Sequence, residues 1–329
     1  MLNRKRKKNV FSFSSPLQYS LSLLICLCSV VAVFQNPTFG QERQVAITFD
    51  DLPVAQSGAT ACEEPGLTSL TKRLLAPFQE NEVPLTAFVI GGRCSELTAE
   101  QRSEVLKLWI AAGAEVGNHT YSHRGLNNTP IEEYEQDILR ADTELKGMLG
   151  LVGLRYFRSP MLQTGPASDI KQRLEQFLRT HGYEQSPVTL DNSDWMFSSL
   201  YSTALARGDN ELAGRVREAY IPYMESVIAF FEQRSIEVVG REFPQILLVH
   251  ANRLNAEAGS SLLAMLKNRA YQFISLGEAL QDLAYSSPND YAGRGGFSWI
   301  HRWSMTKGMP NRGEPEPPDW IVKEYERLQ

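Results

Sequence analysis

The chain has 329 residues and a formal net charge of −5, from 33 basic and 38 acidic side chains. Its first forty residues contain five basic and no acidic side chains, so the remaining 289 residues carry a formal charge of −10. A chain this acidic is a poor candidate for binding nucleic acid or an anionic membrane.

The N-terminal segment has the layout of a secretory signal peptide. A basic cluster at 4–8 precedes an apolar stretch at 21–34 and the small-residue sequence PTFG ahead of Gln41. We predict that residues 1–40 are a signal peptide cleaved after Gly40, and that the protein is exported to the periplasm or the extracellular space. The alternative is an uncleaved N-terminal helix that anchors the chain, although the apolar run falls somewhat short of the roughly 20 residues of a spanning helix. After cleavage we expect no stable membrane insertion.

Beyond Gln41, short β-branched runs alternate with longer helical patterns, which is typical of parallel strands joined by crossover helices. Strands are predicted at 44–49, 85–91, 114–119, 155–159, 187–190, 245–250 and 272–276. Helices are predicted between them, at 67–80, 98–112, 131–149, 167–180, 208–234 and 256–268. Seven strands and six intervening helices predict an α/β fold, either a barrel or an open sheet. The length fits either one large domain or a domain with an extension.

Residues 286–329 lack a clear strand pattern and are predicted to be a C-terminal extension, packed on the preceding domain or partly flexible. Within it, Trp299, His301 and Trp303 alternate along the chain. This alternation allows a β-like edge whose rings stack on sugars, but packing of the extension against the domain is the favoured interpretation.

Polar side chains follow the predicted strands at the points where these strands end. They are Asp50 and Asp51 after the first strand, His119 after the third, Arg158 in the fourth, Asp191 after the fifth and His250 at the end of the sixth. In a parallel α/β barrel the carboxyl ends of the strands form one face, which carries the active site. We therefore expect these segments, far apart in the sequence, to converge.

Two of the five histidines, His119 and His123, lie four residues apart in HTYSH. This spacing brings two imidazoles to one side of a turn and suits a divalent metal. Catalytic zinc sites commonly use three protein ligands and keep one position open, so two histidines and one carboxylate would make such a set.

Five motifs, in this order, carry a family resemblance: TFDD (48–51), HTYSH (119–123), RSP (158–160), DNSDW (191–195) and LVH (248–250). They resemble the motifs of the polysaccharide deacetylases of carbohydrate esterase family 4, the NodB-homology domain, over roughly residues 44–280. The resemblance implies a distorted (β/α) barrel of about seven parallel strands at 41–285. It also implies an exported, metal-dependent deacetylase that removes N-acetyl or O-acetyl groups from a glycan.

The resemblance assigns a role to each motif. Asp50 would be the catalytic base, and Asp51, His119 and His123 would bind the metal, which we expect to be zinc, with cobalt and nickel as alternatives. A cation beside Asp51 would also offset the repulsion between two adjacent carboxylates. His250 would be the acid that protonates the leaving amine. Arg158 would hold the base in place, and Asp191 would orient His250.

The substrate groove is implied in the same way, with Pro160, Met161, Trp195 and Leu248 as its residues. Leu248 would line the pocket for the acetyl methyl group and Trp195 a groove wall. Met161 departs from the family, which usually has an aromatic residue there, but its backbone N–H can still serve an oxyanion hole because the donor belongs to the main chain. The expected partner is an acetylated glycan, of peptidoglycan, chitin-like or xylan-like type.

Two other functions remain open from the sequence. One is hydrolysis of other non-peptide C–N bonds, such as cyclic amides, on the same fold. The other is glycan binding without catalysis, which the complete set of base, acid and ligands argues against.

Two cysteines, Cys62 and Cys94, remain after the predicted signal peptide. In an oxidising compartment they are candidates for one disulfide. They follow the first and second predicted strands, so a bond between them would brace the loop behind Asp51.

Overall fold

The computed structural model describes residues 43–55, 61–63, 66–310 and 312–328. The predicted signal peptide lies outside these ranges. None of the helices in the described ranges combines the length and the apolar character needed to cross a membrane.

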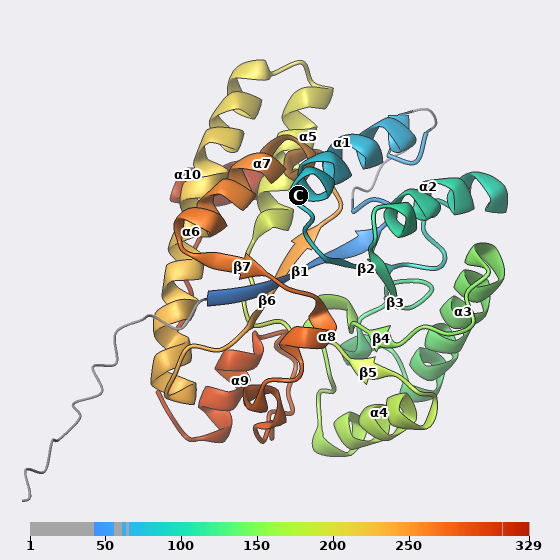
Figure 1. Cartoon of the computed structure of the whole chain (residues 1–329), viewed down its shortest axis with the longest axis vertical. Coiled ribbons are helices and arrows are strands. Elements are labelled where there is room, and N and C mark those ends of the chain that lie inside the picture. Colours follow the sequence, from blue (N-terminus) through green and yellow to red (C-terminus); the bar gives the residue numbers. More distant parts are fainter. Residues whose placement is uncertain (1–42, 56–60, 64–65, 311, 329) are drawn as a thin grey trace, which may run out of the picture. The chain divides into compact units, whose positions relative to one another are not determined.

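Within the described residues, seven parallel strands form one sheet, which is curled into a half-barrel with helices around it (Figure 1). The sheet order is β5-β4-β3-β2-β1-β6. The seventh strand, β7, pairs with residues 43–45 of β1, ahead of Ile47, where the pairing of β1 with β2 begins. The strands are β1 (Arg43–Leu52), β2 (Leu85–Val89), β3 (Glu115–Asn118), β4 (Tyr156–Phe157), β5 (Glu184–Gln185), β6 (Gln245–His250) and β7 (Tyr271–Phe273). The predicted fold class, a distorted (β/α) barrel, is therefore confirmed.

The fifth strand differs from the prediction, which placed it at 187–190. The strand β5 ends at Gln185, and Pro187, which has no N–H to donate, interrupts the ladder. The chain then crosses to the other edge of the sheet, where Leu190 forms a bridge with Leu247 of β6. The predicted segment thus links the β5 edge to the β6 edge of the half-barrel.

Alternation along β1 decides which side chains face the inside of the half-barrel. Phe49 points outward, where it packs edge-on against Phe78 and Trp109 of two covering helices. Residues on the opposite face, among them Thr48 and Asp50, point inward and are almost completely buried. The strand therefore carries a polar group into the interior next to the carboxyl end of the sheet.

Six helices match the predicted ones, and most of their ends lie within a few residues of the predicted bounds. They are α1 (Gly66–Glu80), α2 (Ala99–Ala111), α3 (Ile131–Leu149), α4 (Ser168–Thr180), α6 (Asn210–Val239) and α7 (Arg253–Asn268). The sequence analysis did not predict α5 (Asp194–Ala206), α8 (Leu276–Ala279), α9 (Trp299–Thr306) and α10 (Asp319–Glu326).

The C-terminal residues contain helices that pack on the rest of the fold. The alternating residues Trp299, His301 and Trp303 lie in α9, not in a β-like edge, and all three are buried. Helix α9 contacts α6, and α10 contacts α5. Apolar packing of the two tryptophans explains the pattern better than sugar stacking.

Candidate active site

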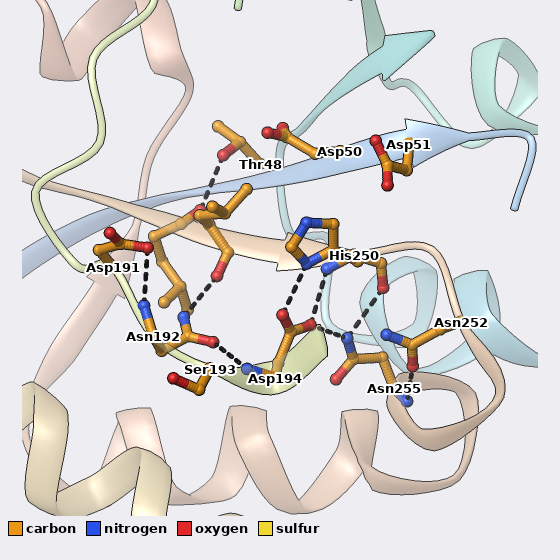
Figure 2. Close-up of polar contacts among 12 residues, drawn as sticks. Thr48, Asp50, Asp51, Asp191, Asn192, Ser193, Asp194, His250, Asn252 and Asn255 are labelled. Atoms are coloured by element: carbon orange, nitrogen blue, oxygen red, sulfur yellow. Dashed lines mark hydrogen bonds and ion pairs between the residues drawn. The ribbon is translucent and has the colours of Figure 1, made fainter. Parts of the chain in front are cut away.

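The two adjacent carboxylates lie near the carboxyl end of β1 (Figure 2). The pairing register between β1 and β2 shifts between Phe49 and Leu52, and Asp51 has a left-handed backbone with φ of 66°. Aspartate tolerates this conformation better than most residues. The irregular backbone aims the two side chains differently. Asp50 pairs with Arg158, Asp51 contacts His123, and Nε2 of His119 lies nearer to Asp51, at 3.4 Å, than to Asp50, at 3.8 Å.

Arg158 is completely buried behind Asp50. Its Nη1 donates to both carboxylate oxygens of Asp50, at 3.1 and 3.2 Å. Its Nη2 donates to the hydroxyls of Thr48 and Ser186, and its Nε donates to the Ser186 carbonyl at 3.0 Å. A guanidinium satisfied on every side holds one orientation, so the predicted pairing of Arg158 with Asp50 is present and fixes the carboxylate.

Asp51, His119 and His123 form a cluster whose ligand atoms all lie within 4.8 Å of one another. The Oδ1 atom of Asp51 lies 3.4 Å from Nε2 of His119 and 3.1 Å from Nε2 of His123. Burial disfavours the charged carboxylate, but the two histidines outweigh it and hold the pKa of Asp51 well below its ordinary value. The cluster thus offers an ionised carboxylate and two imidazoles.

The orientation of His119 is set by a second contact. Its Nδ1 lies 2.7 Å from the carbonyl oxygen of Arg158, which can only accept a hydrogen bond. Nδ1 therefore carries a proton, and Nε2 is the ring nitrogen that faces Asp51. Histidines that bind metals are commonly held by such a contact through the other ring nitrogen. The buried Oδ1 of Asp51 also lacks a hydrogen-bond partner among the described residues, so this donor set fits a divalent metal.

His250 is held by Asp194, not by Asp191 as predicted. Its Nδ1 lies 2.6 Å from Oδ1 of Asp194, and its backbone N–H donates to Oδ2 at 2.9 Å (Figure 2). Asn255 donates a further hydrogen bond to the same carboxylate at 2.8 Å. The DNSDW motif contains two aspartates, and only the second, at the first turn of α5, points toward His250. The predicted role of Asp191 is therefore wrong.

Asp191 lies nearby on the same face, where one of its oxygens accepts a hydrogen bond from the backbone N–H of Asn192. Burial, and next the charge of Glu314, raise its pKa to about 7. Glu314 belongs to the C-terminal extension, which sequence reasoning did not connect with the site.

A cavity of about 560 Å³ lies over the carboxyl ends of the strands; we call it the central cavity. Asp50, Asp51, His119, His123 and His250 line it, together with three of the predicted groove residues, Met161, Trp195 and Leu248. The fourth, Pro160, is buried and begins the turn that carries Met161, but it does not line the cavity.

The Met161 turn is held by residues from the C-terminal extension, which the sequence analysis missed. Met161 and Leu162 both have left-handed backbones, with φ of 49° and 53°. The buried Arg302 of α9 donates hydrogen bonds to the carbonyl of Leu162 and to the hydroxyl of Thr164. A Cβ atom on Gly296 would lie 1.9 Å from the carbonyl oxygen of Met161, so only glycine fits there. The extension therefore forms part of the wall of the central cavity.

The disulfide predicted between Cys62 and Cys94 is present, with Cα atoms 5.4 Å apart. Both cysteines are buried, in an apolar cluster with Val54 and Leu67. The bond joins the segments that follow β1 and β2, close to Asp51.

The fold and the convergent carboxylates and histidines define a class of α/β half-barrel protein in which one cavity collects candidate metal ligands and proton-transfer groups. Residues 40–186 match the family model described as polysaccharide deacetylase. Over these residues the chain is similar to the polysaccharide deacetylases, hydrolases that act on carbon–nitrogen bonds other than peptide bonds.

Individual relatives agree with this assignment. A chitin deacetylase of Colletotrichum lindemuthianum is 24% identical over 246 residues, which are 73% of this chain and 86% of that protein. A peptidoglycan-N-acetylglucosamine deacetylase of Bacillus cereus is 24% identical over 62% of this chain and 64% of its own length. A solved structure of a mutant pseudoenzyme of carbohydrate esterase family 4 has a TM-score of 0.50 and 17% identity, covering 74% of this chain and 68% of that one. This last likeness concerns the fold alone.

Proposed function

We propose that the protein is an exported, metal-dependent deacetylase that hydrolyses the N-acetyl groups of a glycan, with O-acetyl groups as the alternative. One observation carries the proposal: three candidate metal ligands, a buried carboxylate and a carboxylate-bound histidine line one cavity. Binding alone needs no such set, so a catalytically inactive glycan-binding protein is disfavoured.

Asp51, His119 and His123 would hold the metal, and two nitrogens with one oxygen suit zinc, with cobalt or nickel as alternatives. When bound, the metal supplies a Lewis acid that polarises the acetyl carbonyl and makes water a better nucleophile at neutral pH. The related deacetylases of chitin and peptidoglycan support an acetylated glycan as the substrate.

Asp50 is the proposed base that takes a proton from the attacking water. Its carboxylate lines the central cavity and is held from behind by the buried Arg158. The arginine keeps the carboxylate pointing into the cavity. This orientation matters because a general base must lie within hydrogen-bond reach of the proton that it abstracts.

His250 is the proposed acid that protonates the leaving nitrogen. Burial disfavours the imidazolium, but Asp194, Asp51 and Asp50 outweigh burial and raise the pKa of His250 to about 10. A cation bound at Asp51 would move this pKa downward, toward neutral pH, because it offsets the nearby negative charge. Asp194 fixes the ring so that Nδ1 faces the carboxylate and Nε2 remains for the substrate.

The remaining wall of the cavity would receive the acetyl group. Leu248 packs with Leu162 and Val188 in an apolar cluster that suits a methyl group. The backbone N–H of Met161 is the proposed donor to the oxyanion, and this role does not depend on the methionine side chain.

Export is part of the proposal and rests on two observations. The N-terminal forty residues have the order of regions of a signal peptide. The disulfide between Cys62 and Cys94 is of a kind that persists in oxidising compartments.

The decisive experiment removes and restores the metal. We expect a chelator to abolish release of acetate from N-acetylated chito-oligosaccharides, and zinc or cobalt to restore it. His119→Ala and His123→Ala should lose bound metal as measured by atomic emission, whereas His181→Ala, at the end of α4, is the matched control that retains it.

Two outcomes would contradict the proposal. Undiminished metal content in both histidine variants would exclude the ligand assignment. Hydrolysis of small cyclic amides, with no acetate released from any acetylated glycan, would replace deacetylation by the alternative C–N hydrolase activity.

A further inference from the structure

A second cavity, of about 380 Å³, adjoins the central cavity and lies between α5 and α7; we call it the α5–α7 cavity. Asp51, Trp195 and His250 line both cavities. A glycan whose acetyl group reaches the central cavity can therefore extend a neighbouring sugar into the α5–α7 cavity.

The lining of the α5–α7 cavity is hydroxyl-rich and cationic. Ser198, Ser199 and Thr203 lie on one face of α5, at the spacing that a helix of 3.6 residues per turn requires. Arg207 at the end of α5 and Arg253 at the start of α7 add two guanidinium groups. The first turn of α7 contributes the positive end of a helix dipole on the same side.

Neither arginine is neutralised by the described part of the protein. No described carboxylate lies within 4.0 Å of the guanidinium nitrogens of Arg207 or Arg253. The neighbouring Arg73, by contrast, forms an ion pair with Glu257 at 2.9 Å. Two unpaired guanidinium groups beside a cavity are ready donors for a carboxylate.

The two cavities also differ in charge. Beyond the three shared residues, the central cavity has the carboxylates of Asp50, Asp191 and Glu314 in its lining and no arginine or lysine. The α5–α7 cavity has two arginines and no further carboxylate among its described lining residues. This polarity would orient a glycan that carries a negative charge on one side of the acetylated sugar.

We propose that the α5–α7 cavity is a subsite for a sugar that bears a carboxylate and adjoins the acetylated sugar. The inference rests on the proposed deacetylase function, because that function places the acetylated sugar at Asp51 and His250. It adds a substrate class: an acidic, partly N-acetylated glycan in place of a neutral one.

The test compares two oligosaccharides that differ in one group. One is a neutral N-acetylated chitotetraose, and the other carries a carboxylate in place of the primary hydroxyl of a sugar next to an acetylated one. Dissociation constants are measured by calorimetry on Asp50→Asn, which should bind without turnover, and kcat/KM on the unmodified protein. We expect tighter binding of the carboxylated ligand, on the order of tenfold from two partly exposed ion pairs, and a preference that weakens as salt is added.

The double variant Arg207→Gln, Arg253→Gln should bring the ratio of the two dissociation constants to about one. Arg73→Gln is the matched control and should leave the ratio unchanged, because Arg73 does not line this cavity. Equal binding of both ligands, or a preference that survives in the double variant, would overturn the subsite. Loss of acetate release with a retained, arginine-dependent binding preference would instead contradict the deacetylase function alone.

Discussion

At the scale of single residues, the pairing of His250 with Asp194 decides how the proposed acid works. Asp194 is itself buried, and the charge of His250 keeps its pKa below the ordinary value although burial acts in the opposite direction. The pair therefore shares one buried ionic hydrogen bond, and each partner stabilises the charged form of the other.

Asp194→Asn should lower the pKa of His250, because the carboxylate that raises it is lost. Since the acid must be protonated, activity is lost as the pH rises through this pKa, and the alkaline limb of the pH–rate profile should move to lower pH. We also expect turnover of the amide to fall by about 10²- to 10⁴-fold, the usual contribution of a general acid. Esters should suffer less, because an alkoxide leaves more readily than an amine.

The comparison variant is Asp191→Asn, which removes a carboxylate that does not contact His250. Its alkaline limb should move less than that of Asp194→Asn. An equal displacement in both variants would show that Asp194 has no special role.

The sequence predicted the site residues whose position follows from a strand end. Asp50, Asp51, His119 and His250 lie at or near the carboxyl ends of strands, and a parallel fold brings such positions together. The choice between Asp191 and Asp194 could not be made, because it depends on the backbone path of a short loop between Leu190 and α5.

At the scale of secondary-structure elements, α9 supports the Met161 turn through Arg302. This side chain is completely buried and also lies over the ring of Trp299, at 4.2 Å from its centroid. The turn is thereby fixed from a helix more than a hundred residues further along the chain.

Arg302→Met should loosen the Met161 turn and alter the selectivity between acetyl and propionyl substrates, because the turn borders the central cavity. Two polar groups, at Leu162 and Thr164, would lose their donor, and we expect the melting temperature to fall by roughly 5 °C. Enzyme kinetics with both acyl groups and calorimetry measure the two effects.

Arg234→Met is the matched control, since Arg234 is also buried and donates to Ser304 and to the Pro310 carbonyl, outside the site. It should lower the melting temperature and leave acyl selectivity unchanged. If both variants change selectivity equally, the effect of Arg302 is one of general stability.

Among the helices that the sequence predicted, α1 and α3 have a clear apolar stripe. Helix α5 lacks one, because it contacts α6, α7 and α10 and therefore has apolar residues on several sides. A helix covered on several sides loses the 3.6-residue periodicity on which sequence prediction depends.

At the scale of the whole molecule, the proposed metal ligands connect distant parts of the sheet. Asp51 is the residue before the last one of β1, whereas His119 and His123 follow β3, and β2 lies between these two strands. The sequence predicted most of the strands but not their order in the sheet, since that order depends on pairings between distant segments.

Zinc should therefore raise the melting temperature, because a ligand that binds only the folded state stabilises it by about 2.7 kcal/mol at one hundred times its dissociation constant. The increase should be absent in His123→Ala and preserved in His181→Ala, as measured by calorimetry across a zinc titration. A wild-type protein that binds zinc at this site without any thermal shift would contradict the coupling.

The left-handed backbones around the central cavity have a consequence for the evolvability of the enzyme. Asp51, His123, Met161 and Leu162 line the cavity and all have positive φ, a conformation that costs on the order of 1–2 kcal/mol for most residues. The well-packed core offsets this cost. Glycine at such a position would relieve the strain but would also let the loop that positions a reacting group adopt other conformations. At these positions a gain in folding stability would therefore come with a loss of activity.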